Sequence, residues 1–97
     1  MAKGYWITAY RAVSDPAKLA KYAEIAGPAI AAGGGKYLVR GEAATVYEAG
    51  IKARTIVIEF PSVAAAIATH DSKAYQEALA VLGRGAERDI RIVEGMA

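Results

Sequence analysis

The stretch Arg54–Phe60 (RTIVIEF) decides the fold of this 97-residue chain. Its β-branched and aromatic residues are typical of a strand in the interior of a sheet. Pro61 ends the strand, because proline cannot donate to a strand ladder, and Ser62 is a residue type that caps helices. The sequence therefore predicts a strand that leads directly into a helix.

The residues after this strand predict a helical crossover in two pieces and then a return strand. Apolar residues recur on one helical face over residues 63–70 and again over residues 75–82. Asp71 and Ser72 mark the break between the two pieces. Residues 88–94 (RDIRIVE) alternate in polarity, which is typical of a strand with one buried face. The second half of the chain is therefore predicted to form a strand–helix–strand unit.

The first half of the chain shows the same order. Residues 5–11 (YWITAYR) predict a strand, and Pro16 stands where a helix would begin. This helix is expected to kink or restart at residues 27–28 (GP) and to end at the glycines of residues 33–35. Residues 36–41 (KYLVRG) predict the next strand.

Residues 45–48 (TVYE) predict one more short strand, in an arm or hairpin before Arg54. Two strand–helix–strand units with right-handed crossovers place their helices on one face of a four-stranded antiparallel sheet. The predicted fold class is α+β, with a single ferredoxin-like domain of βαββαβ order over residues 1–97.

The face of the sheet away from the helices is expected to be too apolar to stay in water. The hydrophobic fraction of the chain is 55%, but 23 residues are alanine, so the core is thin and calls for burial by a partner. Large exposed apolar patches usually mark interfaces or ligand sites. A homodimer packed sheet to sheet is the hypothesis that follows. The residues that we expect on this open face are Trp6, Thr8, Tyr10, Glu59, Arg40 and Arg91.

Composition excludes several classes of protein. The chain has no cysteine, which excludes a disulfide scaffold, a zinc ribbon and a thiol nucleophile, and suits a reducing compartment. The formal net charge of +2 is far below the charge density of nucleic-acid-binding proteins. No targeting segment is recognised, and no apolar run reaches the ~20 residues that span a bilayer. We therefore expect a cytoplasmic protein without a nucleic-acid or membrane partner.

Three short motifs contain the residue types of known sites but fail on spacing or context. Residues 33–36 (GGGK) follow a helix and lack the flanking residues of a phosphate-binding loop, so they predict a helix-ending turn. Residues 83–85 (GRG) fail the dinucleotide fingerprint for the same reason of context. Residues 70–72 (HDS) have the residue types of a hydrolase triad, but consecutive side chains do not converge. No metal site and no cofactor are indicated.

A set of short motifs, in this order along nearly the whole chain, resembles the domain-of-unknown-function family numbered thirteen-thirty (DUF1330). The resemblance implies a dimeric α/β barrel, that is, a ferredoxin-like fold paired through its sheets, and it implies no established reaction. The motifs are residues 4–7 (GYWI), 26–30 (AGPAI), 38–41 (LVRG), 58–62 (IEFPS), Ser72 with Tyr75, and residues 94–95 (EG).

The resemblance also implies which positions matter in this chain. His70 is a departure, because relatives tend to carry an aromatic side chain at that position. The positions that match the family are Arg40, Glu59, Tyr75, Arg84 and Asp89.

The first functional hypothesis is a protein that binds a small carboxylate-bearing metabolite between sheet and helices. Arg40 would hold the carboxylate in a bidentate contact, and aromatic side chains would pack on the apolar body of the ligand. Glu59 is unusual in its apolar strand, and it is expected to pair with Arg40 or Arg91 unless it serves the ligand. The predicted ligand-binding residues are Trp6, Tyr10, Arg40, Glu59 and Tyr75, with His70 beside them.

Two other classes of function stay open at this point. A cofactor-independent monooxygenase or isomerase would use His70, the only histidine, as general base and Arg40 to stabilise an oxyanion. A purely structural interaction dimer would have its interior filled by its own side chains. The presence or absence of a cavity distinguishes this last class from the first two.

Overall fold

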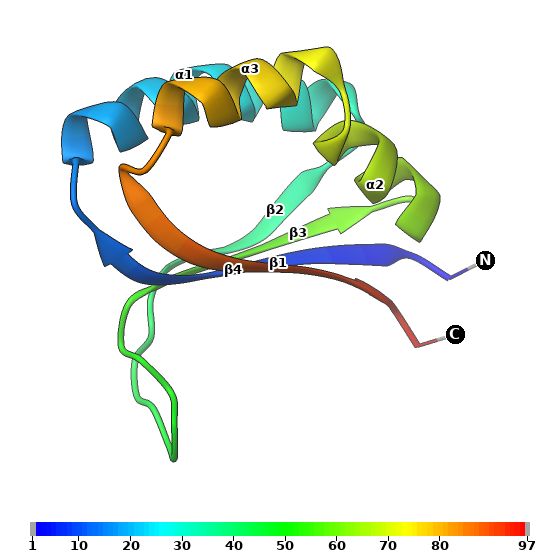
Figure 1. Ribbon diagram of the computed structural model, residues 1–97. Helices are drawn as coiled ribbons and strands as arrows, with labels where there is room; N and C mark the ends of the chain where they lie inside the picture. Colours follow the sequence, from blue (N-terminus) through cyan, green and yellow to red (C-terminus); the bar gives the residue numbers. More distant parts are fainter. Residues whose placement is uncertain (1, 97) are drawn as a thin grey trace.

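The computed structural model describes residues 2–96 and contains one four-stranded antiparallel sheet and three helices. The strand order is β2-β3-β1-β4, and all the helices lie on one face of the sheet (Figure 1). The predicted ferredoxin-like βαββαβ arrangement is confirmed. The elements are β1 (Gly4–Val13), α1 (Pro16–Ala32), β2 (Lys36–Glu42), β3 (Arg54–Phe60), α2 (Val63–His70), α3 (Lys73–Leu82) and β4 (Ala86–Glu94).

Short polar side chains start each helix, as the sequence indicates. The Asp15 carboxylate accepts a hydrogen bond from the Lys18 backbone amide at 3.1 Å at the start of α1. The Ser62 hydroxyl caps α2, and the Ser72 hydroxyl caps α3 after the expected break. In contrast to the predicted kink or restart, α1 is assigned as one helix that runs through Pro28.

The predicted strand at residues 45–48 is wrong. This segment belongs to the loop between β2 and β3, which extends beyond the sheet on the side away from the helices (Figure 1). The β2–β3 ladder ends at the pair of Glu42 and Arg54, so the loop residues have no neighbouring strand to bond. A favourable residue pattern makes a strand only where a partner supplies hydrogen bonds.

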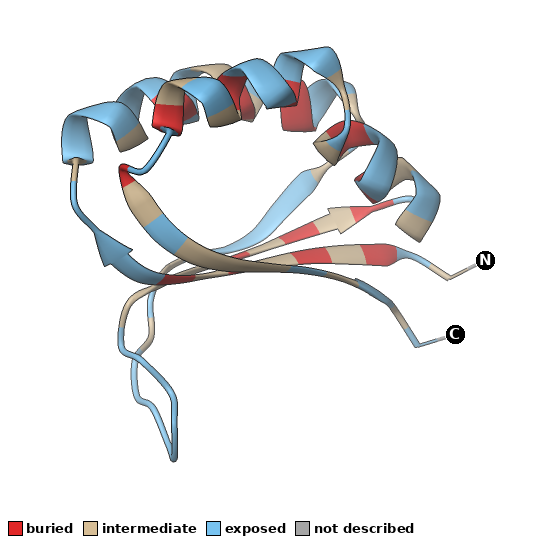
Figure 2. Ribbon diagram, in the orientation of Figure 1, coloured by how far each residue is buried: buried red, intermediate tan, exposed pale blue. Residues whose placement is uncertain are grey.

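The predicted open face is wrong for Trp6, Thr8, Tyr10 and Arg40, and it is right for Glu59 and Arg91. Trp6 lies opposite Ile58 and Thr8 opposite Ile56, so these side chains share one face, and that face points toward the helices. Trp6 is only 1% exposed and Tyr10 is buried. Buried positions form separate bands along the strands (Figure 2). Glu59 lies opposite Tyr5, and both point to the other face.

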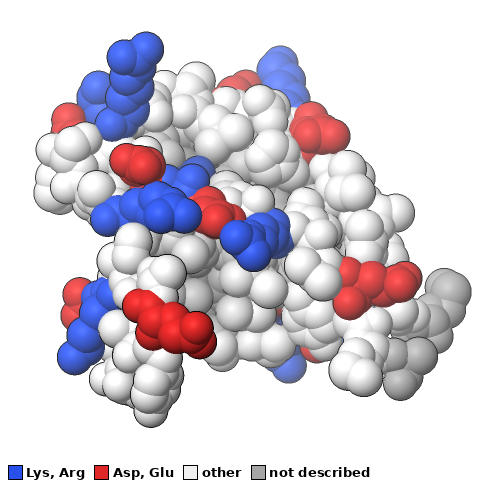
Figure 3. All heavy atoms as spheres, turned by 60° about the horizontal axis from the view of Figure 1, so that its bottom comes forward, with Lys and Arg blue, Asp and Glu red and all other residues white. Residues whose placement is uncertain are grey.

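The open face nevertheless carries apolar side chains. They come from the alternate positions of each strand, and Val39 and Val93 are 49% and 48% exposed. Acidic and basic side chains lie next to one another here rather than in patches of one sign (Figure 3). Arg91 bonds Asp89, and Lys3 pairs with Glu59. The apolar residues on this face are Tyr5, Ile7, Ala9, Val39, Val57 and Val93.

The helices cover the sheet unevenly. Of the three, α2 packs closely on β1, β3 and β4, whereas α1 packs mainly on α3. The sheet-facing side of α1 is therefore separated from the strands below it, and a cavity lies between them. None of the helices over residues 2–96 is long and apolar enough to cross a membrane.

Candidate functional site

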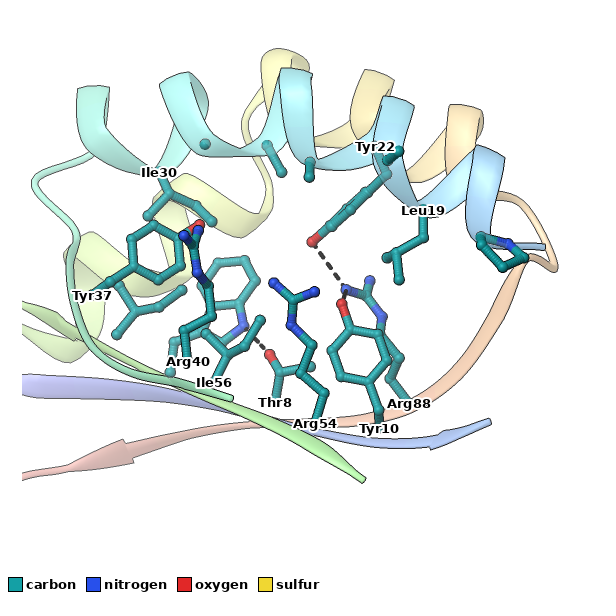
Figure 4. Close-up of a pocket in the computed structure, with 17 residues that line it drawn as sticks. Thr8, Tyr10, Leu19, Tyr22, Ile30, Tyr37, Arg40, Arg54, Ile56 and Arg88 are labelled. Carbon is teal, nitrogen blue, oxygen red and sulfur yellow. Dashed lines mark hydrogen bonds between the residues drawn. The ribbon is translucent and has the colours of Figure 1, made fainter. Parts of the chain in front are cut away.

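The cavity between α1 and the sheet has a volume of about 260 Å³. Its floor is the helix-facing side of the strands and its roof is α1, with polar groups concentrated on the floor (Figure 4). Most of its wall is apolar, which suits a small organic ligand. The apolar lining residues are Trp6, Pro16, Leu19, Ala20, Ala23, Ala26, Gly27, Ile30, Ile56 and Ile58.

Arginines from three different strands reach this cavity. Arg40 comes from β2, Arg54 from β3 and Arg88 from β4, and no aspartate or glutamate is among the lining residues. Glu42 lies opposite Arg54 in the ladder, but among residues 2–96 none of the three guanidinium groups has a carboxylate within 4.0 Å. The cavity is therefore strongly cationic.

Arg88 is held by tyrosine hydroxyls. Its guanidinium donates to the Tyr22 hydroxyl at 3.0 Å and to the hydroxyls of Tyr10 and Tyr75 at 3.5 Å each. It also lies 4.7 Å from the centre of the Tyr22 ring and 5.6 Å from that of Tyr10, both within cation–π range. Its donors are directed at these fixed hydroxyls, so Arg88 organises the end of the cavity near β4.

Arg40 and Arg54 are held less completely. Arg54 lies 6.0 Å from the Tyr10 ring centre, and its Nε is buried with no hydrogen-bond partner among the described residues. Arg40 lies 5.4 Å from the ring centre of Tyr37 and likewise bonds no side chain of the described part of the chain. Because Arg40 lies opposite Ile56, it is a diagonal neighbour of Arg54 on the same face. Both guanidinium groups can therefore donate to one ligand.

A pair of tyrosines joins the cavity to the core. The hydroxyl oxygens of Tyr22 and Tyr75 are 2.6 Å apart, and their rings meet edge to face. Burial raises the pKa of Tyr75 well above its usual value, so this hydroxyl keeps its proton at neutral pH. The Thr8 hydroxyl, on the floor, accepts the Trp6 indole N–H at 2.9 Å.

The structure brings together only part of the predicted site. Trp6, Tyr10 and Arg40 line the cavity, and Tyr75 stands behind Tyr22 without lining it. Glu59 lies outside, on the open face, where it accepts a hydrogen bond from the Tyr5 hydroxyl at 3.0 Å. The expected pairing of Glu59 with Arg40 or Arg91 is wrong, because Arg40 points to the other face and Arg91 bonds Asp89.

His70 lies apart from Arg40. Its ring packs 5.4 Å from the Trp6 indole and 5.2 Å from the Tyr75 ring, and it does not line the cavity of the arginines. It lines a different, shallow depression with Ile90 and Ile92, and its Nδ1 lies 3.1 Å from the Asp71 carboxylate. The combination of His70 as base with Arg40 as oxyanion ligand is not present in one cavity.

Sequence reasoning missed Arg54, Arg88, Tyr22 and Tyr37 as lining residues. A signal for the arginines was available in strand parity: Arg54 lies two and four residues before buried Ile56 and Ile58 and so shares their face, and Arg88 shares a face with Ile90 and Ile92 in the same way. An arginine on the apolar face of a strand needs a polar environment there. Among residues 2–96 no cluster of three or more His, Cys, Asp or Glu side chains is placed to hold a metal ion.

Fold and cavity together define a small ferredoxin-like α+β protein with a cationic cavity beneath its first helix. The chain belongs to the family described as Domain of unknown function (DUF1330), whose model matches residues 3–96. The resemblance drawn from the sequence motifs is confirmed. The comparison with curated proteins finds no match.

Solved structures share the fold at low sequence identity. A protein of unknown function from Rhodopseudomonas palustris has a TM-score of 0.76 at 17% identity, over 99% of this chain and 84% of its own. A dimeric ferredoxin-like protein of unknown function from Thermobifida fusca has a TM-score of 0.64 at 17% identity, over 95% and 90%. A Caulobacter crescentus protein provisionally named an antibiotic biosynthesis monooxygenase has a TM-score of 0.59 at 17% identity, over 99% and 91%.

Proposed function

We propose that this protein binds a small carboxylate-bearing metabolite in the cavity between α1 and the sheet. The observation that carries the proposal is the set of three lining arginines with no carboxylate among them, one of which has a buried and unpartnered Nε. Charges gathered in a partly desolvated space repel one another and raise the free energy of the empty site. A bound anion would relieve this repulsion.

Each part of the cavity has a role in this proposal. Arg54 and Arg40 hold the carboxylate, because guanidinium groups make paired, charge-assisted hydrogen bonds to carboxylate oxygens. The apolar body of the ligand lies against Trp6, Ile30 and Ile58. The volume of about 260 Å³ suits a metabolite with a single ring or a short chain.

The other two classes of function receive less support. A purely structural dimer would have a filled interior, whereas a cavity lies under α1. The cofactor-independent monooxygenase or isomerase requires His70 and Arg40 at one ligand, and these residues line separate cavities. The name of the Caulobacter crescentus protein favours an oxygenase, but at 17% identity the likeness concerns the fold alone.

Replacing Arg54 with methionine is expected to weaken anion binding while leaving the protein folded. Loss of a charge-assisted contact worth about 1.5–3 kcal/mol weakens affinity roughly 10- to 100-fold. The melting temperature of the free protein should stay the same or rise, because an uncompensated charge is removed. Calorimetric titration with benzoate, and with benzamide as its uncharged counterpart, measures the effect.

The controls for this experiment are two other arginine variants. Arg40→Met should behave as Arg54→Met does, whereas Arg84→Met removes an exposed charge away from the cavity and should bind benzoate normally. The proposal fails if benzoate binds no better than benzamide to the wild-type protein. It also fails if Arg54→Met melts far lower and still binds benzoate.

We also propose that a second copy of this chain packs on the open face of the sheet. Support comes from its half-exposed apolar side chains, among them Val39 and Val93, and from the dimeric Thermobifida fusca neighbour. Apolar area of this kind is usually covered in soluble proteins. The centre of this interface would be formed by Ile7 and Val57, which lie opposite each other on the two central strands.

Ile7→Glu is expected to convert the dimer into a folded monomer, because the new carboxylate would be desolvated at the centre of the interface. Light scattering should give twice the chain mass of 10.1 kDa for the wild-type protein and 10.1 kDa for the variant. Ala31→Glu, on the exposed side of α1, is the matched control and should remain dimeric. A wild-type mass of 10.1 kDa would refute the proposal.

A further inference from the structure

The donor in the hydrogen bond between the Tyr22 and Tyr75 hydroxyls can be assigned from the other contacts of Tyr75. This side chain is 0% exposed, and among residues 2–96 its hydroxyl meets only the Tyr22 hydroxyl at 2.6 Å and the Arg88 guanidinium at 3.5 Å. A guanidinium donates and never accepts. The Tyr75 proton therefore has one available acceptor, the Tyr22 oxygen, since a buried hydroxyl left without an acceptor is costly.

The proton of the Tyr22 hydroxyl is consequently free to donate a hydrogen bond to a ligand. The hydroxyl oxygen accepts one hydrogen bond from Tyr75 and another, at 3.0 Å, from Arg88. These two bonds use both lone pairs of the Tyr22 oxygen. Its own proton has no acceptor among the described residues. Tyr22 lines the cavity, and its hydroxyl points down into it from α1 (Figure 4). The proton of Tyr22 is thus directed at whatever occupies the cavity.

The same reasoning applies to the floor of the cavity. The Thr8 oxygen accepts the indole N–H of Trp6, and no described residue accepts the Thr8 proton. With the guanidinium groups of Arg40 and Arg54, the side chains that face the ligand offer hydrogen-bond donors and no carboxylate acceptor. A ligand whose polar groups are acceptors, such as a carboxylate and a carbonyl, satisfies the donors of Arg40, Arg54, Tyr22 and Thr8.

The donors occupy two ends of the cavity. Arg54 stands on β3, and Tyr22 bonds Arg88, which stands on β4. Since β1 lies between β3 and β4, the backbones that carry these two ends are about 10 Å apart, at about 4.8 Å per strand. One compact ligand can therefore contact both ends.

We propose that the ligand is an oxo-carboxylate, with a carboxylate at Arg40 and Arg54 and a carbonyl oxygen that accepts the proton of Tyr22. This inference rests on the proposed function, since it assumes that the carboxylate binds in this cavity. It adds that Tyr22 determines specificity, because a site built to donate to a ligand oxygen rejects the analogue without that oxygen. Tyr75 and Arg88 act as positioning residues that set the direction of the Tyr22 hydroxyl.

The test compares 4-acetylbenzoate with 4-isopropylbenzoate, which keeps the carboxylate and shape but has a methyl group in place of the ketone oxygen. The ratio of their dissociation constants, measured by calorimetric titration, is expected to change about 10-fold between the wild-type protein and Tyr22→Phe, as loss of one hydrogen bond predicts. Only the ketone should lose affinity. Tyr47→Phe, at an exposed tyrosine, is the matched control and should leave the ratio unchanged.

A second measurement needs no ligand. Tyr22→Phe strands the Tyr75 proton in the core and removes the Arg88 contact at 3.0 Å, whereas Tyr75→Phe removes a donor and leaves the Tyr22 oxygen bonded to Arg88. Tyr22→Phe should therefore lower the melting temperature more than Tyr75→Phe. The opposite order would reverse the assigned direction of the bond and overturn the inference.

The outcomes separate this inference from the proposed function. If both benzoates bind, Arg54→Met weakens both, and Tyr22→Phe leaves their ratio unchanged, the oxo-carboxylate assignment is wrong and the carboxylate site stands. If neither benzoate binds the wild-type protein, the carboxylate site and the oxo-carboxylate assignment fail together. A ratio that changes in Tyr22→Phe while Arg54→Met binds normally keeps the Tyr22 contact and rejects the arginine site.

Discussion

Trp6→Glu is expected to unfold the chain, whereas the neighbouring change Ile7→Glu leaves the subunit folded. Trp6 is 1% exposed and packs against Phe60, His70 and Tyr75. Removing a buried Trp side chain costs about 3–5 kcal/mol, and burying an unpaired carboxylate adds several more. Since domains of this size are stable by only about 5–15 kcal/mol, the sum is comparable to the whole stability.

Circular dichroism with urea denaturation checks this prediction. Trp6→Glu should lack a cooperative transition, and Ile7→Glu should retain one, because Ile7 points to the open face. The pair is well matched because the two residues are adjacent and receive the same carboxylate. A folded Trp6→Glu protein beside an unfolded Ile7→Glu protein would mean that the two faces of the sheet are exchanged.

Tyr75→Ala is expected to lower the free energy of unfolding by about 3–5 kcal/mol, as do other truncations of buried aromatic residues. Tyr75 is fully buried, contacts the rings of Trp6 and Tyr22, and bonds the Tyr22 hydroxyl. Tyr47→Ala is the control, because Tyr47 is 79% exposed, and it should change the stability by less than about 0.5 kcal/mol.

Urea titration of both tyrosine variants measures the difference. The lower stability of Tyr75→Ala has three causes: a cavity is left in the core, the edge-to-face ring contacts are lost, and Arg88 loses one hydrogen-bond acceptor. Similar stabilities for Tyr75→Ala and Tyr47→Ala would show that Tyr75 contributes no packing to the core, contrary to its contacts.

Local features of the sequence predicted the elements well. Ser62 and Ser72 start α2 and α3 because their hydroxyls can satisfy free backbone amides wherever the helices lie. The core of β3 was evident from its composition, which suits a buried strand in almost any sheet. The order in which these elements follow one another in the structure is the one that these local features predicted.

Pairing between distant segments was less predictable. The residues at 45–48 have a strand-like pattern, yet the neighbour they would need is absent, and they form a loop. The two faces of β1 were exchanged because Trp6 and Ile7 are both apolar, so alternation alone gives no direction. Only the helices, by covering one face, distinguish the two.

For the candidate site too, local features could be predicted from the sequence, whereas contacts between distant segments could not. The sequence alone was enough to single out Arg40 as a candidate anion ligand and to give the topology that carries it, because charge, caps and strand patterns are local properties. The tertiary structure alone decided that Arg54 and Arg88 line one cavity with Arg40, that Glu59 points away, and that His70 packs on Trp6 outside this cavity. The physical reason is that a site is made of side chains from separate strands and helices, and their shared face depends on register and packing rather than on any one segment.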